Sequence, residues 1–198
     1  MALLFFYDTE TTGIPNFKEP SEHPGQPHIV QIAAALVDDE TRKTVSSINL
    51  IIKPDGWTIP EELTEIHGIS TDFALETGVS ITRALQVFFG LWKGRKRVGF
   101  NESFDARIIR IAQHKLGSPE EQLEAWKNGD KECAMYAARK HTNLPKNKLP
   151  KLIEAYQHFF GEGFDGAHDA MNDVNALIAV YFAVKDADAK LIEVVQND

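Results

Sequence analysis

Several acidic residues occupy positions that the hydrophobic pattern predicts to face the interior. This feature constrains the fold more strongly than any other in the sequence. From Leu3 to Glu10 the residues alternate as in a β-strand, so Leu4, Phe6, Asp8 and Glu10 share one face and two acids finish an apolar row. Carboxylates that face a core lose hydration and repel one another unless protons or cations compensate them. The fold must therefore gather compensating charge at the end of this strand.

Two helical patterns place further acids on inward faces. The stripes at helical spacing are Asp105, Ile108, Ile109, Ala112 and Leu116 in one helix, and Asp173, Leu177, Val180, Tyr181 and Val184 in another. A single acid in a first helical turn is usually explained by capping and the helix dipole. Four inward acids in one chain are better explained by hard divalent cations, which prefer oxygen ligands.

The order of elements predicts an α/β domain with a mixed central sheet. Strands are expected at residues 3–8, 28–37, 45–52 and 97–100, and helices at 60–66, 80–92, 103–116 and 170–185. From residue 131 onward the chain is expected to be mostly helical after one short strand. A turn at 38–41 makes the second and third strands a hairpin, and the proline-rich stretch 14–27 is expected to be a long surface loop.

Length and composition predict one domain spanning residues 1–198. The chain has 43% apolar residues, which is enough for a sizeable core, but no run near the roughly 20 apolar residues of a membrane span. The first residues lack the basic segment of a secretory leader, and Cys133 is the only cysteine, so no intramolecular disulfide forms. We expect a cytoplasmic protein without a membrane partner.

The net charge of −8 argues against a long grip on a nucleic-acid backbone, although bound cations would reverse the field around the acids. Basic residues gather at positions 93–97 and 146–151. We interpret the first group as a solvated surface.

His168 lies five residues before Asp173, about 140° away on an ideal helix, so the two do not share a helical face. With Gly166 just upstream, we expect His168 in the loop that approaches the helix, leaning over the same acids. A lone histidine is usually structural or merely exposed. Its neighbours make this one a candidate catalytic residue.

Three segments of the chain resemble the motifs of one enzyme family. They are Asp8-Thr9-Glu10-Thr11-Thr12-Gly13, Gly99-Phe100-Asn101-Glu102-Ser103-Phe104-Asp105 and His168-Asp169-Ala170-Met171-Asn172-Asp173. They resemble the DEDDh 3′→5′ exonucleases, which include the proofreading subunit of bacterial DNA polymerase III, ribonuclease T, oligoribonuclease and exonuclease X. Residues 28–32 and 66–70 resemble the segments between the family's motifs. The loop at 14–27 is longer than in the compact members, and residues 131–133 depart from the commoner pattern.

The resemblance implies a ribonuclease-H-like fold, with a five-stranded mixed sheet and helices on both faces. It implies two divalent metal ions, Mg²⁺ or Mn²⁺, held by Asp8, Glu10, Asp105 and Asp173, and it makes His168 the general base. Contacts with the terminal nucleotide are implied for Thr11, Gly13, Ile14, His67, Asn101 and Phe104. Packing is an equally good explanation of Phe104.

The resemblance implies hydrolysis from the 3′ end of nucleic acid, with single-stranded or frayed ends preferred and DNA favoured over RNA. An RNA 3′ trimming nuclease remains an alternative, because the 2′-OH is recognised by a few contacts that the sequence does not place. A non-catalytic module for nucleic-acid binding or polymerase docking is a third interpretation. Loss of a metal ligand would indicate such a module, and none of the four acids is lost.

Overall fold

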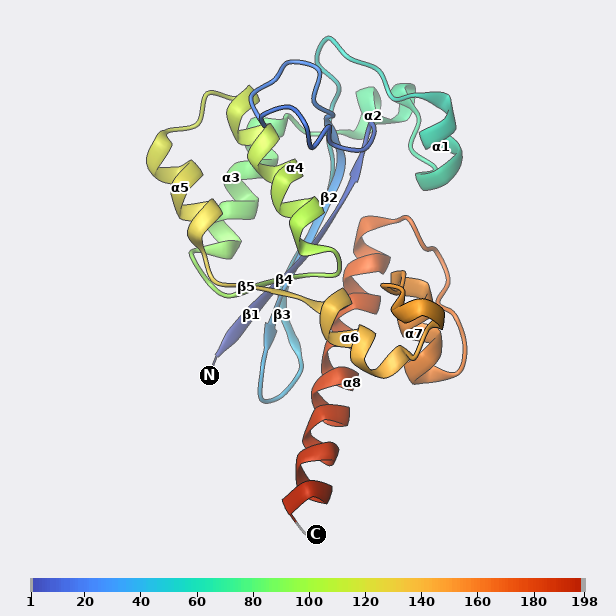
Figure 1. Cartoon of the computed structure of the whole chain (residues 1–198). Helices are drawn as coiled ribbons and strands as arrows, with labels where there is room; N and C mark the ends of the chain where they lie inside the picture. Colours follow the sequence, from blue (N-terminus) through green and yellow to red (C-terminus); the bar gives the residue numbers. More distant parts are fainter. Residues whose placement is uncertain (1, 197–198) are drawn as a thin grey trace.

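A five-stranded mixed sheet forms the centre of the computed structural model, which describes residues 2–196. Its strand order is β3-β2-β1-β4-β5 (Figure 1), with bounds β1 Leu3–Thr11, β2 Ile29–Asp38, β3 Thr44–Ile51, β4 Arg97–Gly99 and β5 Lys131–Cys133. The first three strands pair antiparallel, while β4 is parallel to both β1 and β5. The predicted mixed sheet and the hairpin of β2 and β3 are confirmed.

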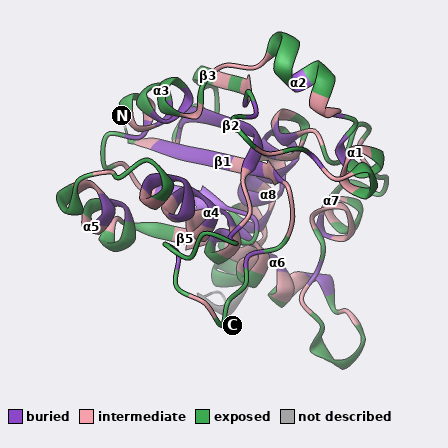
Figure 2. Ribbon diagram, turned by 90° about the horizontal axis from the view of Figure 1, so that it is seen from above, coloured by how far each residue is buried: buried purple, intermediate pink, exposed green. Residues whose placement is uncertain are grey.

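Helices cover both faces of the sheet, as expected. Phe6 and the other side chains on one face of β1 pack against α6, α7 and α8, whereas Phe5 and Tyr7 on the other face pack against α3, α4 and α5. Figure 2 shows the mostly buried strands β1 and β2 with helices on either side of them. The helices are α1 Glu61–His67, α2 Thr71–Thr77, α3 Ile81–Trp92, α4 Glu102–Lys115, α5 Glu120–Asn128, α6 Ala134–Thr142, α7 Leu152–Phe160 and α8 Ala170–Gln196, with a 3₁₀ turn at Pro145–Asn147.

The structure corrects two details of the expected helices. Leu116 was assigned to the inward stripe of α4, but the helix ends one residue earlier, and the Leu116 side chain is exposed. The last helix extends beyond residue 185 to Gln196, so its final turns project from the domain (Figure 1). In the first case the apolar periodicity continues past the end of the helix. In the second case it stops before the helix ends.

Arg97 contradicts the interpretation of residues 93–97 as a solvated surface. Its side chain is buried, its Nε lies 2.8 Å from Glu102 Oε1, and its guanidinium lies 4.1 Å from the ring centroid of Trp126. The Arg97 Nη1 also donates to the Trp126 carbonyl at 2.6 Å. A guanidinium that is paired and hydrogen-bonded is tolerated in an interior, and here it joins β4 to the first turn of α4.

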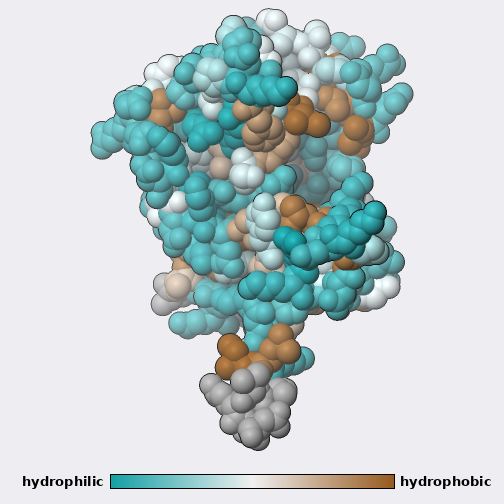
Figure 3. All heavy atoms as spheres, viewed as in Figure 1, coloured by the Kyte–Doolittle hydropathy of each residue, from teal (hydrophilic) through white to brown (hydrophobic). Residues whose placement is uncertain are grey.

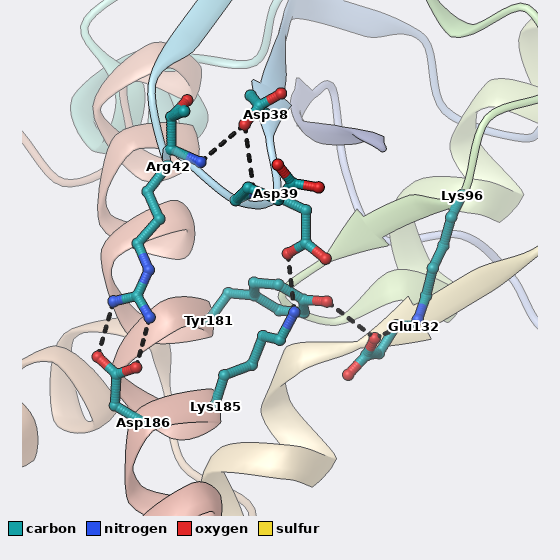
Figure 4. A network of polar contacts seen from close by, with 10 residues as sticks. Asp38, Asp39, Arg42, Lys96, Glu132, Tyr181, Lys185 and Asp186 are labelled. Atoms are coloured by element: carbon teal, nitrogen blue, oxygen red, sulfur yellow. Dashed lines mark hydrogen bonds and ion pairs between the residues drawn. The ribbon is translucent and has the colours of Figure 1, made fainter. Parts of the chain in front are cut away.

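Polar contacts fasten α8 to the sheet side of the molecule (Figure 4). Arg42 in the turn between β2 and β3 forms an ion pair with Asp186, and Lys185 Nζ lies 2.7 Å from Asp39 Oδ1. On the same face as Lys185 and one turn earlier, the Tyr181 hydroxyl donates to Glu132 at 3.2 Å. Exposed pairs of this kind contribute little each, so α8 is held mainly by its apolar stripe.

Among the described residues, no helix is both long enough and apolar enough to cross a membrane.

Candidate active site

All four predicted metal ligands and His168 line one pocket of about 300 Å³. The pocket lies at the end of β1, between the first turns of α4 and α8. Its walls are Asp8, Thr9, Glu10, Phe100, Asn101, Phe104, Asp105, Leu152, His168 and Asp173. Residues as far apart in the sequence as Asp8 and Asp173 are thus brought to one place, as the hydrophobic pattern predicts.

Because β4 is short, Asp105 of α4 can contact the end of β1. The paired residues of β1 and β4 end at Phe6 opposite Val98, so β1 continues beyond its neighbour. The free Thr9 N–H, which a longer β4 would have paired, donates instead to Asp105 Oδ1 at 3.1 Å. The Thr9 hydroxyl donates to the same oxygen at 2.7 Å. One oxygen of Asp105 is therefore fixed by β1.

The start of α8 is fixed by a glutamine on the neighbouring strand. Gln31 on β2 stands opposite Glu10 in the register, and its side chain donates to Asp169 Oδ2 at 2.9 Å. Its Oε1 accepts from the Ala170 N–H at 3.1 Å, while Asp169 Oδ1 accepts from the N–H groups of residues 171 and 172. Asp169 is thus the N-terminal cap of α8. These contacts fix the start of α8, and therefore the position of Asp173 one turn further along the helix.

His168 lies in the loop before α8, where the sequence places it. Its backbone is left-handed, with φ of 69°, and its N–H donates to Asp173 Oδ2 at 3.3 Å. Ligand atoms of Glu10, His168 and Asp173 all lie within 4.8 Å of one another. The loop is tight because Gly166, at φ 69°, accepts from Asn172, and a side chain at Gly166 would meet that amide.

Burial is the main cause of a raised pKa in all four acids, and the charges of neighbouring carboxylates add to it. Burial raises the pKa of Glu10 to about 8, with the charges of Asp173 and Asp105 adding to it. The pKa of Asp105 rises to about 7 through burial, although the Thr9 hydrogen bonds oppose the shift. That of Asp173 rises to about 6, and burial followed by the charge of Asp105 keeps the pKa of Asp8 well above its ordinary value. Full ionisation of the four acids therefore needs added positive charge.

The residues present fit divalent cations. The side chains converging on the pocket offer carboxylate oxygens, which hard cations prefer. Asp173 Oδ1 is buried and has no hydrogen-bond partner among the described residues, an arrangement that a coordinated cation would satisfy. Asp8, Glu10, Asp105 and Asp173 would hold the ions.

The predicted nucleotide contacts divide into two sets. Asn101 and Phe104 line the pocket, whereas Thr11, Gly13, Ile14 and His67 do not. The Thr11 hydroxyl is occupied within its own turn, donating to the Gly13 carbonyl at 2.7 Å. Gly13 has φ of 153°, a conformation that side chains disfavour, and it leads into an exposed Ile14.

His67 is buried at the end of α1, and its Nδ1 accepts from the Ile69 N–H at 3.2 Å. Its Nε2 has no partner among the described residues. Burial, and then the nearby His168, lower the pKa of His67. A neutral His67 near His168 is compatible with a role at the edge of the site.

Thr9 and Gln31 position the acids, but the sequence did not single them out as functional. Both lie in segments that resemble the family, but the resemblance assigned neither side chain a role. The position of each residue in its strand was the signal that could have identified it. Thr9 stands between two inward acids, on the opposite face of the strand from them, and Gln31 interrupts the apolar run 29–37 of β2.

A second pocket, of about 180 Å³, lies apart from the acids. It is lined by Pro27, His28, Ile29, Ile52, Asp55, Trp57, Ile81, Ala112, Lys115 and Leu116. Asp55 is its single carboxylate, so it offers no comparable site for cations.

The family model described as exonuclease, of the ribonuclease T type, matches residues 5–181. No curated protein sequence matches the chain.

Among solved structures, exonuclease I is similar over all of this chain, with a TM-score of 0.77 and 22% identity. Exonuclease I of E. coli in complex with a dT13 oligonucleotide is similar over 98% of the chain, with a TM-score of 0.77 and 21% identity. The complex of the same enzyme with a dA16 oligonucleotide gives a TM-score of 0.76, 23% identity and the same 98% coverage.

The chain spans only 44%, 43% and 42% of the lengths of these three structures, respectively. At these identities the similarity establishes the fold, which is the predicted ribonuclease-H-like one.

Proposed function

Since the chain belongs to the ribonuclease T family of exonucleases, which are 3′→5′ exonuclease hydrolases, we propose that it removes nucleoside 5′-monophosphates stepwise from single-stranded or frayed DNA 3′ ends. The observation that carries the proposal is the group of four acids and one histidine in a single pocket. Their raised pKa values and the unpartnered Asp173 Oδ1 support divalent cations as cofactors, with Mg²⁺ or Mn²⁺ as the ions.

The proposed reaction is hydrolysis of the last phosphodiester bond. Water forms a bond to phosphorus while the bond to the 3′ oxygen of the preceding nucleotide breaks, leaving a shortened strand with a 3′ hydroxyl. Two cations held by the acids would supply Lewis acidity to the attacking water and to the departing oxygen. This chain's residues orient those ions: Thr9 fixes Asp105, and the Asp169 cap fixes the turn that carries Asp173.

His168 is proposed as the general base that removes the proton from the attacking water. An imidazole changes charge near neutral pH, and the ring lies within 4.8 Å of carboxylate oxygens of Glu10 and Asp173. The side chain is exposed, so the proton can pass on to solvent.

Phe104 and Asn101 line the same pocket and are proposed to contact the terminal nucleotide. Ile14, His67 and the turn of Thr11 and Gly13 are proposed contacts at its rim.

Single-stranded DNA is proposed as the substrate. The terminal nucleotide must leave its stack to reach the acids, which costs about a few kcal/mol in a duplex. The similar E. coli enzyme has been crystallised with dT13 and dA16 oligonucleotides, and this supports a single strand for the present chain. The net charge of −8 also favours a local contact over a long grip on duplex backbone.

A matched set of labelled oligonucleotides tests the substrate. DNA and RNA of one sequence, each single-stranded and as a blunt duplex, are incubated with the protein and Mg²⁺ or Mn²⁺. The proposal predicts fastest release of mononucleotides from single-stranded DNA. Faster hydrolysis of the RNA strand would replace the DNA substrate with RNA, and no hydrolysis of any strand would contradict the proposed function.

A further inference from the structure

Two large apolar side chains are exposed on the loop that joins β1 to β2. Ile14 is 80% exposed and Phe17 is 59% exposed. On the face seen in Figure 3, apolar side chains gather beside the hollow that separates the upper part of the molecule from the α6 and α7 part. Exposed apolar side chains that form a contiguous patch mark binding surfaces more often than single ones do.

The loop holds Phe17 in a fixed turn. Gln26 is buried inside the loop, where its amide donates to the carbonyls of Asn16, Glu19 and Pro20 at 3.0, 3.3 and 3.0 Å. Its Oε1 accepts from the Asn16 N–H at 3.0 Å, and the Glu19 N–H closes the turn on the Asn16 carbonyl at 3.2 Å. Phe17 follows Asn16 at the tip of this turn.

Three cations of α4 dock the same loop against the helix. Arg107 donates to the carbonyls of Asn16 and Glu19, and its guanidinium lies 5.2 Å from the centroid of the Phe17 ring. Arg110 Nε donates to Ser21 Oγ at 3.0 Å, and Lys115 Nζ donates to the carbonyl of residue 26 at 2.6 Å. The ring is thus supported from below by a cation, and its position is set before any ligand arrives.

The contacts of Phe17 with α4 place it near the catalytic pocket. Arg107 lies three residues after Phe104, on the same side of α4, and Phe104 lines the pocket. Ile14 follows Glu10 by four residues, which limits its distance to about 14 Å. Figure 1 shows this loop, in dark blue, beside α4 and the end of β1. A nucleic-acid strand whose 3′ end lies among the acids would therefore pass beside Phe17.

We propose that Phe17, supported by Arg107, is a stacking surface for unpaired bases of the substrate's 3′ segment, upstream of the nucleotide that is removed. This inference rests on the proposed function. Base stacking on an aromatic ring carries no charge requirement and tolerates any sequence, so it suits a protein of net charge −8 that has limited means of attracting phosphates.

Binding of a fluorescent DNA decamer tests the proposal independently of hydrolysis. The decamer carries a methylphosphonate at its 3′-terminal linkage, which prevents cleavage, and a second decamer lacks the bases upstream of the terminal nucleotide. Fluorescence anisotropy gives the Kd of each. Phe17→Ala should raise the Kd of the complete decamer about 5- to 150-fold, the range expected for one stacked base, and should change the Kd of the abasic decamer less than about twofold.

Two further variants serve as controls. Phe17→Trp retains an aromatic face and should bind the complete decamer as the parent does. Phe73→Ala removes an exposed phenylalanine of α2 that lines no part of the pocket, and it should leave both Kd values unchanged. An unchanged Kd for the complete decamer in Phe17→Ala, or equal weakening of both decamers, would overturn the stacking surface.

Hydrolysis of an ordinary phosphodiester decamer by the parent protein, measured separately, distinguishes this failure from failure of the proposed function. A parent that cleaves the decamer while Phe17→Ala binds it normally refutes only the stacking surface. A parent that does not cleave it refutes the proposed function, and the two Kd values still decide whether Phe17 contacts bases.

Discussion

Raising the pH without divalent cations should destabilise this protein, because Glu10 must lose a proton in the company of other acids. The pKa of Glu10 rises from 4.5 to about 8 in the folded state. Between these values the folded protein holds a proton that the unfolded chain has lost. The stabilisation that comes from protonated Glu10 is therefore complete below pH 4.5 and is lost as the pH rises through 8.

The size of the effect follows from that shift. Between pH 5.5 and 8, proton linkage for one carboxyl with this shift amounts to about 2 to 3 kcal/mol of unfolding free energy once its partial exposure to water is considered. For a chain of this length the change corresponds to about 5 to 10 °C in Tm. A divalent cation at about 100 times its Kd would restore about 2.7 kcal/mol.

Thermal unfolding measured by circular dichroism at pH 5.5 and 8, in chelator and in Mg²⁺, provides the test. Glu10→Gln should reduce the pH dependence in chelator, with the remainder coming from the raised pKa values of Asp8, Asp105 and Asp173. Glu40→Gln, which removes an exposed acid from the turn between β2 and β3, should leave it as in the parent. A Tm that is constant or rises from pH 5.5 to 8 in chelator, or that falls equally in Glu10→Gln, would refute the reasoning.

Three further outcomes can be measured. Thr9→Val removes the hydroxyl bonded to Asp105 and should weaken Mn²⁺ binding about 10-fold by calorimetry, whereas Thr9→Ser should retain it; equal Kd values would contradict the positioning role. His168→Ala should lose about 10² to 10⁴ in kcat, with activity recovering as pH rises, and parental rates at neutral pH would remove it as the base. A stable blunt duplex should be hydrolysed more slowly than its separated strand, and equal rates would argue against a preference for unpaired ends.

The periodicity of the sequence was sufficient to predict the central sheet and the inward acids. Alternation placed Asp8 and Glu10 on one face of β1, and helical spacing placed Asp105 and Asp173 in the first turns of α4 and α8. These are local properties, because each depends only on neighbours in the chain. The loop position of His168 followed from its angular separation from Asp173.

What the sequence did not reveal depends on contacts between distant segments. The basic run at 93–97 looked solvated because the pairing of Arg97 with Glu102 and its stacking on Trp126 require β4, α4 and α5 to be assembled. The bond from Thr9 to Asp105 depends on how far β4 extends beside β1. The short helices α2 and α5 were not predicted either, since neither carries an extended apolar period.

The most direct test of the central claim follows the cleavage of a 5′-labelled single-stranded DNA over time. The account predicts a ladder that shortens one nucleotide at a time from the 3′ side in Mg²⁺ or Mn²⁺, is abolished by chelator, and is nearly absent with Asp8→Ala or Asp173→Ala proteins that remain folded. Immediate release of a labelled mononucleotide, activity that survives chelation, or a fully active Asp8→Ala protein would contradict it.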